Sequence, residues 1–311
     1  MQLGKIWLKT LKTLHLISET TYRRGKIKYI PHINKQELQK QIDNFQGSGI
    51  TDQPRFPKLI VSLTSFPERM YDIHFTLYSL LNQTLKPDAV ILWLAEEQFP
   101  NKDKDIPQDV LNLQKNGLTI KWCKDLRSYK KLIPALAEFP KDVIVTADDD
   151  IYYPSSWLEL LYTGYLRNPR AIHCHRGHKI QFDKAGQILP YKKWKHRISH
   201  DFASFHNFFT GAGGVLYPPR CLHKDVSDPK LFQLLAPNAD DIWFWSMAII
   251  NGTAINIVDN NLKQLIYVNP ERELKLTSEI TLAMVNTSSG QNDQQLKQIM
   301  KHYPQLATFL N

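Results

Sequence analysis

The stretch DVIVTADDDIYYP, residues 142–154, decides the fold class. It opens as a short apolar, β-branched run, which is typical of a buried strand, and leads directly into Asp148, Asp149 and Asp150. Three like charges at one strand end are unfavourable unless a cation offsets them, and carboxylate oxygens suit Mg²⁺ or Mn²⁺. A calcium ion that only braces the chain, or a charged surface loop, is the structural alternative.

Upstream, strands and helices alternate. Apolar runs predict strands at 59–65, 89–95, 118–122 and 142–147, and helical spacing predicts helices at 73–81 and 131–138. This alternation predicts a parallel, doubly wound sheet, whose ligands bind beyond the carboxyl ends of the strands. Residues 62–69, 125–131 and 148–150 all follow such ends. We therefore expect one cleft there.

Two further motifs lie downstream. FFTGAGGVLYPP, residues 208–219, places Gly211, Gly213 and Gly214 where the backbone approaches something closely or takes a positive φ. It lacks both nucleotide-binding glycine patterns, so it predicts the floor of a sugar or acceptor pocket, although a tight turn explains it equally well. APNADDIWFW, residues 236–245, places Asp240 and Asp241 at the start of an aromatic helix, as caps or as a general base.

A histidine cluster and a basic patch come between these motifs. In IHCHRGHKI, residues 172–180, alternation places His173 and His175 on one face, which offers His175 as a further metal ligand; such histidines also form hydrogen bonds within a fold. The basic patch at 192–197 could steer a phosphate-bearing acceptor or be a solvated surface. We expect residues 190–207 to form a loop that closes over the site.

Bulk composition bounds the remaining classes. The 311 residues are 42% hydrophobic, enough for a substantial core, and the net charge of +9 predicts an anionic partner. The basic residues form patches and no continuous groove, so nucleic acid is not expected. Three widely spaced cysteines predict neither disulfides nor a zinc site. Without a signal peptide or a long apolar run, a cytoplasmic location is expected.

The N-terminus predicts a basic amphipathic helix over residues 3–17. Leucines, Trp7 and Ile17 recur at helical spacing on one side, and Lys5, Lys9 and Lys12 recur on the other. Such a helix either lies on an anionic membrane, here the inner face of the cytoplasmic membrane, or docks on the protein's own core. A polar stretch without clear periodicity follows, up to Pro57.

The motif order carries a family resemblance over roughly residues 58–260. An apolar strand, DDD, an aromatic-flanked GAGG and an aspartate pair before a helix resemble the metal-dependent, inverting GT-A glycosyltransferases, including the Fringe-like β-1,3-transferases. The segments VSLTSFPERM, QTLKPDAVILWLA, DLRSYKKLIPAL and VTADDDIYY resemble bacterial transferases of capsule and lipopolysaccharide synthesis. One departure is that Asn238-Ala239, and no proline, directly precedes the aspartate pair.

The resemblance implies an α/β fold of GT-A type, a Rossmann-like doubly wound mixed sheet flanked by helices, in a single catalytic domain. It divides into a basic N-terminal segment (1–57), a nucleotide-sugar half (58–155), an acceptor and catalytic half (156–275) and a helical tail (276–311). The implied reaction moves a hexose from a UDP-linked donor to a hydroxyl of an oligosaccharide or lipid-linked acceptor, with Mn²⁺ or Mg²⁺.

Site roles follow residue by residue from the resemblance. Asp150 and Asp148, with His175, would hold the metal, and Asp241 would be the base, with Asp240 as the substitute. The sugar or acceptor pocket would use Gly211, Gly213 and Gly214. The nucleotide and donor would meet Ser62, Thr64, Ser65, Arg69, Asp125, Lys130, Lys131, Asp148 and Asp149.

Three other functions stay open at this stage. A retaining transferase of the same fold would share every motif. A nucleotidyltransferase or phosphotransferase would also need clustered aspartates, but it should show a phosphate-cradling glycine loop or catalytic lysine after a strand. A non-catalytic membrane scaffold explains the basic N-terminus and leaves the three aspartates without a reason.

Overall fold

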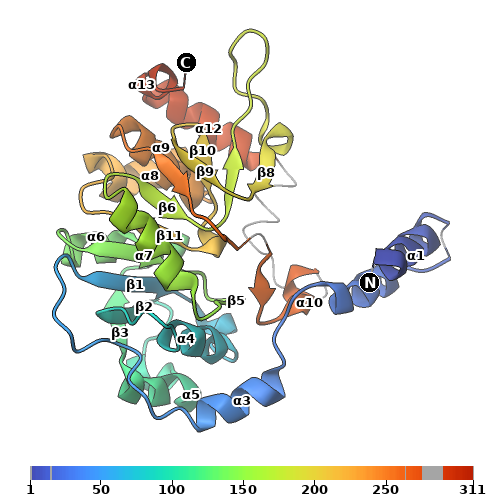
Figure 1. Ribbon diagram of the computed structural model, residues 1–311, viewed down its shortest axis with the longest axis vertical. Coiled ribbons are helices and arrows are strands. Elements are labelled where there is room, and N and C mark those ends of the chain that lie inside the picture. Colours follow the sequence, from blue (N-terminus) through green and yellow to red (C-terminus); the bar gives the residue numbers. More distant parts are fainter. Residues whose placement is uncertain (1, 15, 263, 275–289, 311) are drawn as a thin grey trace.

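A mixed eight-stranded sheet runs through the body of the protein, with helices on both faces (Figure 1). The computed structural model describes residues 2–14, 16–262, 264–274 and 290–310. In spatial order the strands are β3 (Leu118–Cys123), β2 (Ala89–Ala95), β1 (Leu59–Thr64), β4 (Val143–Thr146), β11 (Val215–Tyr217), β6 (Ile172–Cys174), β12 (Ile255–Ile257) and β9 (Asp201–Ser204). The predicted doubly wound α/β class is confirmed.

Two strands of this sheet, β11 near its middle and β9 at its edge, run against the other six. β3, β2, β1 and β4 are parallel, whereas β11 runs antiparallel to both β4 and β6. Val215 pairs with Thr146, so the segment that enters β11 lies beside the segment that leaves β4. The two halves proposed to meet near residue 155 therefore contribute strands to one sheet.

Alternation along the strands feeds two cores. On β1, Ile60 packs into the cluster on one face, and Leu59, Val61 and Leu63 pack into the cluster on the other. The second face is covered by α4 (Ile73–Leu81), α5 (Gln108–Leu111) and α7 (Trp157–Arg167). The first face is covered by α6 (Ile133–Glu138), α8 (Pro229–Leu235), α9 (Asp240–Ile250), α12 (Gln291–His302) and α13 (Gln305–Thr308).

Two small sheets sit beside the large one. The first contains β10 (Asn207–Phe209), β7 (Gly177–Lys179) and β8 (Lys195–Ile198), and the second pairs β13 (Ile266–Tyr267) with β5 (Ile151–Tyr152). The expectation of a loop at 190–207 is wrong, because this segment contains β8 and β9, which pair with β7 and β12.

The first two helices, α1 (Gln2–Thr13) and α2 (Glu19–Lys26), form an arm that projects from the body (Figure 1). The helix expected over 3–17 ends earlier, as α1, and the stretch expected to lack periodicity holds α2 and α3 (Lys35–Asp43). Residues 31–33 join the arm to the body: the Ile33 N–H donates to the Tyr267 carbonyl, and the Tyr267 N–H donates to the Pro31 carbonyl. Docking of the first helix on the protein's own core is therefore not observed.

The C-terminal segment brings α10 (Pro270–Glu273) next to the body, and the predicted last helix is observed as α12. The early part of the predicted tail, residues 276–289, lies outside the described residues. Cys123, Cys174 and Cys221 are all free thiols, as predicted. Within the described ranges, no helix is both long and apolar enough to cross a bilayer.

Candidate active site

The three aspartates are fixed at the carboxyl end of β4 by contacts to their backbone. Thr76 donates its hydroxyl to the Asp149 carbonyl at 3.0 Å, and the Val268 N–H donates to the Asp150 carbonyl at 3.0 Å. Tyr153 accepts from the Asp148 N–H at 2.9 Å and donates to the Ala212 carbonyl at 3.1 Å. Tyr153 thus ties the aspartate triplet to the glycine-rich loop.

The three side chains do not point the same way. Asp149 is buried, at 8% side-chain exposure, and accepts hydrogen bonds of 2.5 Å from both Ser65 and Arg69. Asp148 and Asp150 keep 29% and 23% of their side chains exposed. Asp149 therefore anchors the turn, and its two neighbours present carboxylates toward solvent.

Arg69 lies beneath this turn. One of its guanidinium nitrogens is 2.5 Å from Asp149 and 2.7 Å from Asp150. Burial raises the pKa of Asp150 to about 6, opposed by Arg69 and reinforced by the charges of Asp149 and Asp148. Arg69, together with Lys131, which pairs with Asp148 and is shared with Asp240, supplies fewer positive charges than the three carboxylates carry, so the triplet retains excess negative charge.

Lys131 connects the triplet to the start of α9. Its ammonium is 2.9 Å from Asp148 and 3.0 Å from Asp240, and only 7% of its side chain is exposed. Burial alone would lower the pKa of Lys131, but Asp148, Asp240 and Asp241 outweigh that effect and hold it well above its usual value. The lysine is therefore a charged bridge between two walls of one cluster.

Asp241 stands beside this bridge. The Gly211 N–H donates to its carboxylate at 3.0 Å. Burial, followed by the charge of Asp240, raises the pKa of Asp241 to about 7, against the opposing effects of Lys131 and the Gly211 N–H. A carboxylate with a pKa in this range can both accept and release a proton near neutral pH.

Two glycines of the glycine-rich loop have no room for a side chain. A Cβ on Gly211 would lie 2.7 Å from the Lys131 ammonium and 2.8 Å from an Asp241 oxygen. Gly214 has a φ of +93°, and a Cβ there would lie 2.4 Å from the Trp157 indole nitrogen. This loop therefore packs directly against the charged cluster.

The residues at the end of β1 are already engaged with other parts of the fold. Ser62 is completely buried, donates to the Lys131 carbonyl at 2.7 Å and accepts from the Trp93 indole at 3.0 Å. Thr64 donates to the Trp93 carbonyl at 2.8 Å. Ser62 therefore positions Lys131 and is not exposed to a ligand, while a nucleotide contact by Thr64 stays a prediction.

Asp125 and Lys130 form an ion pair of 2.5 Å, in which the lysine is nearly fully buried. Burial would raise the pKa of Asp125, but hydrogen bonds from Lys130 and the Arg127 N–H together hold it below its usual value. Asp125 keeps 31% of its side chain exposed. A contact to a nucleobase stays a prediction for Asp125, and Lys130 is committed to the pair.

His175 is placed differently from a metal ligand. It is fully buried, one ring nitrogen lies 2.9 Å from the Trp157 carbonyl, and the other lies 3.3 Å from the Leu262 N–H. His173 is likewise hydrogen-bonded, to the Asn168 carbonyl and to Asn256. With both ring nitrogens engaged, His175 has no lone pair to offer a metal as it is placed here.

The donor set for a cation is therefore two carboxylates. Across the described part of the chain, no three His, Cys, Asp or Glu side chains are grouped as a metal site. Mg²⁺ and Mn²⁺ that serve phosphate substrates are held by one or two carboxylates, with phosphates and waters completing the shell. Asp148 and Asp150, partly exposed and carrying excess negative charge, fit that requirement.

Several residues of the site carry no signal in the sequence. Tyr153 and Trp157 lie a few residues after the triplet, and their aromatic type alone does not separate them from core residues. The Lys131–Asp240 pair joins residues far apart in the chain, and no local sequence pattern predicts such a pair. Tyr191 lies close enough to Asp241 to feel its charge. Burial, followed by the charge of Asp241, raises the pKa of the Tyr191 phenol.

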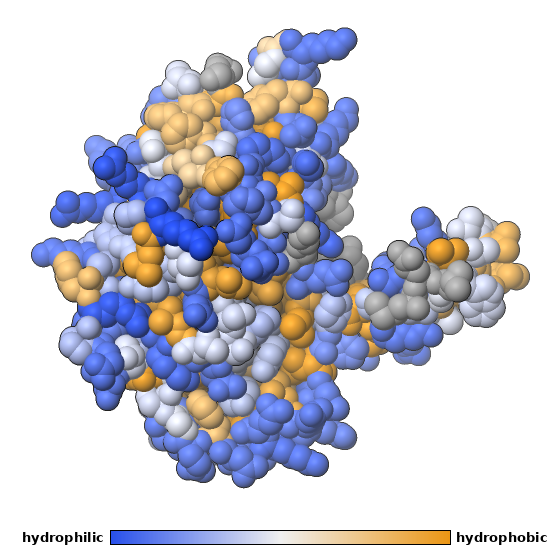
Figure 2. Space-filling model, in the orientation of Figure 1, coloured by the Kyte–Doolittle hydropathy of each residue, from blue (hydrophilic) through white to orange (hydrophobic). Residues whose placement is uncertain are grey.

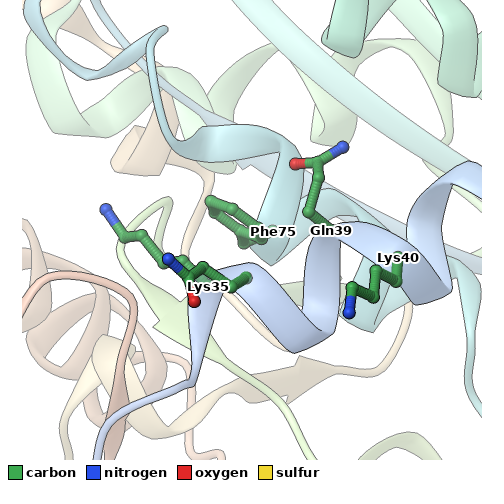
Figure 3. A pocket seen from close by; sticks show the side chains of 5 residues that line it. Lys35, Gln39, Lys40 and Phe75 are labelled. Carbon is green, nitrogen blue, oxygen red and sulfur yellow. The ribbon is translucent and has the colours of Figure 1, made fainter.

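A surface hollow of about 530 Å³ lies elsewhere, between α3 and α4 (Figure 3). Its lining residues are Lys35, Gln36, Gln39, Lys40 and Phe75. The Lys35 ammonium lies 5.7 Å from the centre of the Phe75 ring and 3.2 Å from Asp72. The hollow contains none of the cluster residues, so the chemistry is sought at the triplet.

No protein-family model and no curated protein matches the chain. Among solved structures it is similar to S. aureus TarS 1-349, with 13% identity over 80% of this chain and 73% of that one, at a TM-score of 0.44. The same protein in complex with UDP gives 16% identity over 79% and 72%, at 0.45. The inositol-1-phosphate CTP transferase from T. maritima gives 14% over 76% and 98%, at 0.41. Similarities this weak assign no ligand or reaction to this chain.

Proposed function

We propose that this protein is a metal-dependent, inverting glycosyltransferase that moves a hexose from a UDP-linked donor to a hydroxyl of a growing surface glycan or lipid-linked saccharide. The observation that carries the proposal is the Lys131 bridge. Through it, the exposed carboxylates after β4 and the aspartate pair at the start of α9 belong to one cluster. A sugar transfer needs both parts: a cation site for the leaving diphosphate and a separate base for the acceptor.

Asp148 and Asp150 would hold Mn²⁺ or Mg²⁺. When bound, the ion neutralises charge that develops on the diphosphate as it leaves. Arg69 and Asp149 keep the turn in place, so the two partly exposed carboxylates would hold the ion with little reorganisation. The buried ammonium of Lys131 adds a second fixed positive charge beside Asp148.

Asp241 is the proposed base, and Asp240 is a positioning residue. Asp240 is held by Lys131, whereas Asp241 accepts only one hydrogen bond among those the structure describes, from Gly211. The acceptor oxygen would bond to the anomeric carbon as its proton passes to Asp241. The bond from that carbon to the diphosphate oxygen breaks in the same step, which inverts the configuration.

The acceptor would approach past a basic and aromatic wall. Gly213 packs on Arg176, and Arg176 lies close enough to His178 and His196 to help lower the pKa of both, after burial. Tyr191 stacks edge-on against His196, with ring centres 5.3 Å apart. Flat rings next to cations suit a saccharide that carries a phosphate.

Calorimetric titration of nucleotides and UDP-sugars, with Mn²⁺ and with chelator, tests the proposal. We expect Mn²⁺-dependent binding of a UDP-linked donor that Asp150→Ala abolishes and that Asp52→Ala, an exposed aspartate far along the chain from the triplet, leaves intact. Absence of binding under every condition contradicts the proposal.

Product analysis separates the neighbouring reaction classes. A glycosyltransferase releases UDP, and the anomeric configuration of the product, read by NMR, distinguishes inversion from retention. Release of pyrophosphate in a separate assay with a nucleoside triphosphate and a sugar phosphate would assign a nucleotidyltransferase.

A further inference from the structure

The projecting arm exposes an unusual share of apolar surface. Among the described residues, nine large hydrophobic side chains are exposed, and four of them lie in the first sixteen positions: Ile6 (61%), Trp7 (65%), Leu14 (61%) and Leu16 (65%). Figure 2 shows hydrophobic side chains at the outer end of the arm, away from the body. Folding of the body does not bury this surface.

The face of α1 that packs is a different one. Leu8 lies over Gly25 of α2, where an added Cβ would be 2.7 Å from a Leu8 methyl. The Tyr29 ring likewise lies against Gly4. At 100° per residue, Gly4, Leu8 and Leu11 form one stripe, whereas Trp7 and Leu14 lie two turns apart on a neighbouring stripe. The exposed apolar stripe is therefore left over after α1 and α2 have paired.

The arm is also strongly basic. The first thirty residues contain seven Lys and Arg and one acidic residue, Glu19. Glu19 pairs with Lys12 and Arg23. Lys9, Arg24 and Lys28 are exposed to solvent. The arm thus carries most of the net charge of the chain beside its exposed apolar stripe.

We propose that the arm binds the surface of an anionic lipid bilayer. In this arrangement α1 lies in the plane of the interface, with Trp7 and Leu14 among the acyl chains and the basic side chains among the headgroups. Charge complementarity favours an anionic bilayer over a second copy of the protein as the partner of the arm. Pairing of two arms would bring two strongly positive segments together. The inference does not depend on the transfer reaction.

Trp7 provides a direct readout. The protein has seven tryptophans, and Trp7 is the one that is exposed in the described structure. On addition of mixed phosphatidylcholine–phosphatidylglycerol vesicles we expect a blue shift of its emission and quenching by brominated acyl chains. Pure phosphatidylcholine vesicles should give a much smaller change, and added salt should weaken binding to the anionic ones.

Variants separate the arm from the rest of the surface. Trp7→Ser/Leu14→Ser should lower co-sedimentation with the anionic vesicles by at least about tenfold. Lys9→Gln/Arg24→Gln should lower it and weaken its dependence on salt. The matched control is Leu166→Ser/Leu234→Ser, which removes side chains that are 64% and 69% exposed on α7 and α8 and should leave vesicle binding unchanged.

Two results would overturn the proposal. One is equal affinity of the wild type and the arm variants for the vesicles. The other is concentration-dependent dimerisation in sedimentation velocity that Trp7→Ser/Leu14→Ser abolishes, without vesicle binding by the wild type. Near-ultraviolet circular dichroism, which reports the buried tryptophans, checks that each variant is folded. None of these experiments needs a sugar donor.

Discussion

Lys131 is the residue on which the site depends most. Its buried ammonium is shared by Asp148 and Asp240, which come from different elements, and its carbonyl accepts from Ser62 in the core. Such a bridge offsets carboxylates that would otherwise repel one another, and its own high pKa keeps it charged.

Replacing Lys131 by Met should therefore destabilise the fold. Removing one partner of a buried ion pair leaves the other charge uncompensated, which costs about 3 kcal/mol. Urea unfolding at neutral pH measures this loss, and Lys131→Met/Asp240→Asn should recover part of it. The control is Lys121→Met, whose partner Glu138 is 39% exposed and whose loss should cost less than about 1 kcal/mol. Equal losses in the two lysine variants would contradict the bridge.

Asp241 gives the protein a defined pH dependence. Its pKa is raised from 3.8 to about 7 in the folded state, so the folded chain binds more protons than the unfolded chain between these values. The contribution of Asp241 to the free energy of unfolding should therefore decrease as the pH rises from about 4 to about 7.

Urea unfolding at several pH values, on the protein without metal or donor, tests this sign. Asp241→Asn should flatten the decline, since the amide does not titrate. In the transfer reaction the same group must be ionised, so kcat/KM should rise through a pKa near 7. An unchanged pH profile in Asp241→Asn would remove this aspartate from the proposed role.

The sequence predicted the chemical type of the site residues better than their orientation. It could not reveal that Asp149 turns inward, because Ser65 and Arg69, which hold it, follow a different strand. It offered His175 as a ligand from strand alternation alone. Its ring nitrogens are taken by main-chain atoms of Trp157 and Leu262, which only the folded chain brings there.

At the scale of elements, local patterns were reliable where a segment is buried along its whole length. The predicted bounds of β2 and α4 are those observed, because continuous apolar runs end at turn residues. The short pairs were missed: β5 and β13 are two residues each and depend on long-range hydrogen bonds. β8 and β9 were missed since exposed, charged segments carry little strand signal.

The glycine-rich loop supports a paired prediction. Gly214→Ala places a Cβ against Trp157 at a φ of +93° and should lower stability by about 2 kcal/mol. Gly211→Ala instead crowds the end of the Lys131 side chain and the Asp241 carboxylate. It should reduce turnover at least about tenfold with a smaller loss of stability. Thermal melting and steady-state kinetics on both variants measure this contrast, and wild-type turnover in Gly211→Ala would contradict it.

For the whole molecule, the body should be stable without its arm. Residues 31–33 fasten the chain to β13, and α1 packs on α2. Deletion of residues 1–28 should therefore shift Tm by only a few degrees. For a chain of this size, such a shift corresponds to a change of about 1 kcal/mol in the free energy of unfolding. Calorimetry or circular dichroism melting measures the shift. A collapse of cooperative unfolding would show that the arm belongs to the folded core.

The overall arrangement was only partly predictable. Alternating strands and helices indicate a doubly wound sheet, yet nothing local shows that β11 enters it antiparallel between β4 and β6. The amphipathic pattern of the first residues predicted a helix and left its placement open, since docking and membrane binding need the same periodicity.

The pairing of β4 with β11 also limits how the two segments of the candidate site can move. Val215 and Thr146 are register partners, so the turn that carries the aspartates and the loop that carries the glycines are joined by one backbone ladder. A hinge cannot open between two adjacent strands of a sheet without breaking that ladder. The two segments should therefore stay fixed relative to each other, and under the proposed function a wider range of donors would have to come from changes of side chain, beginning with Ala212.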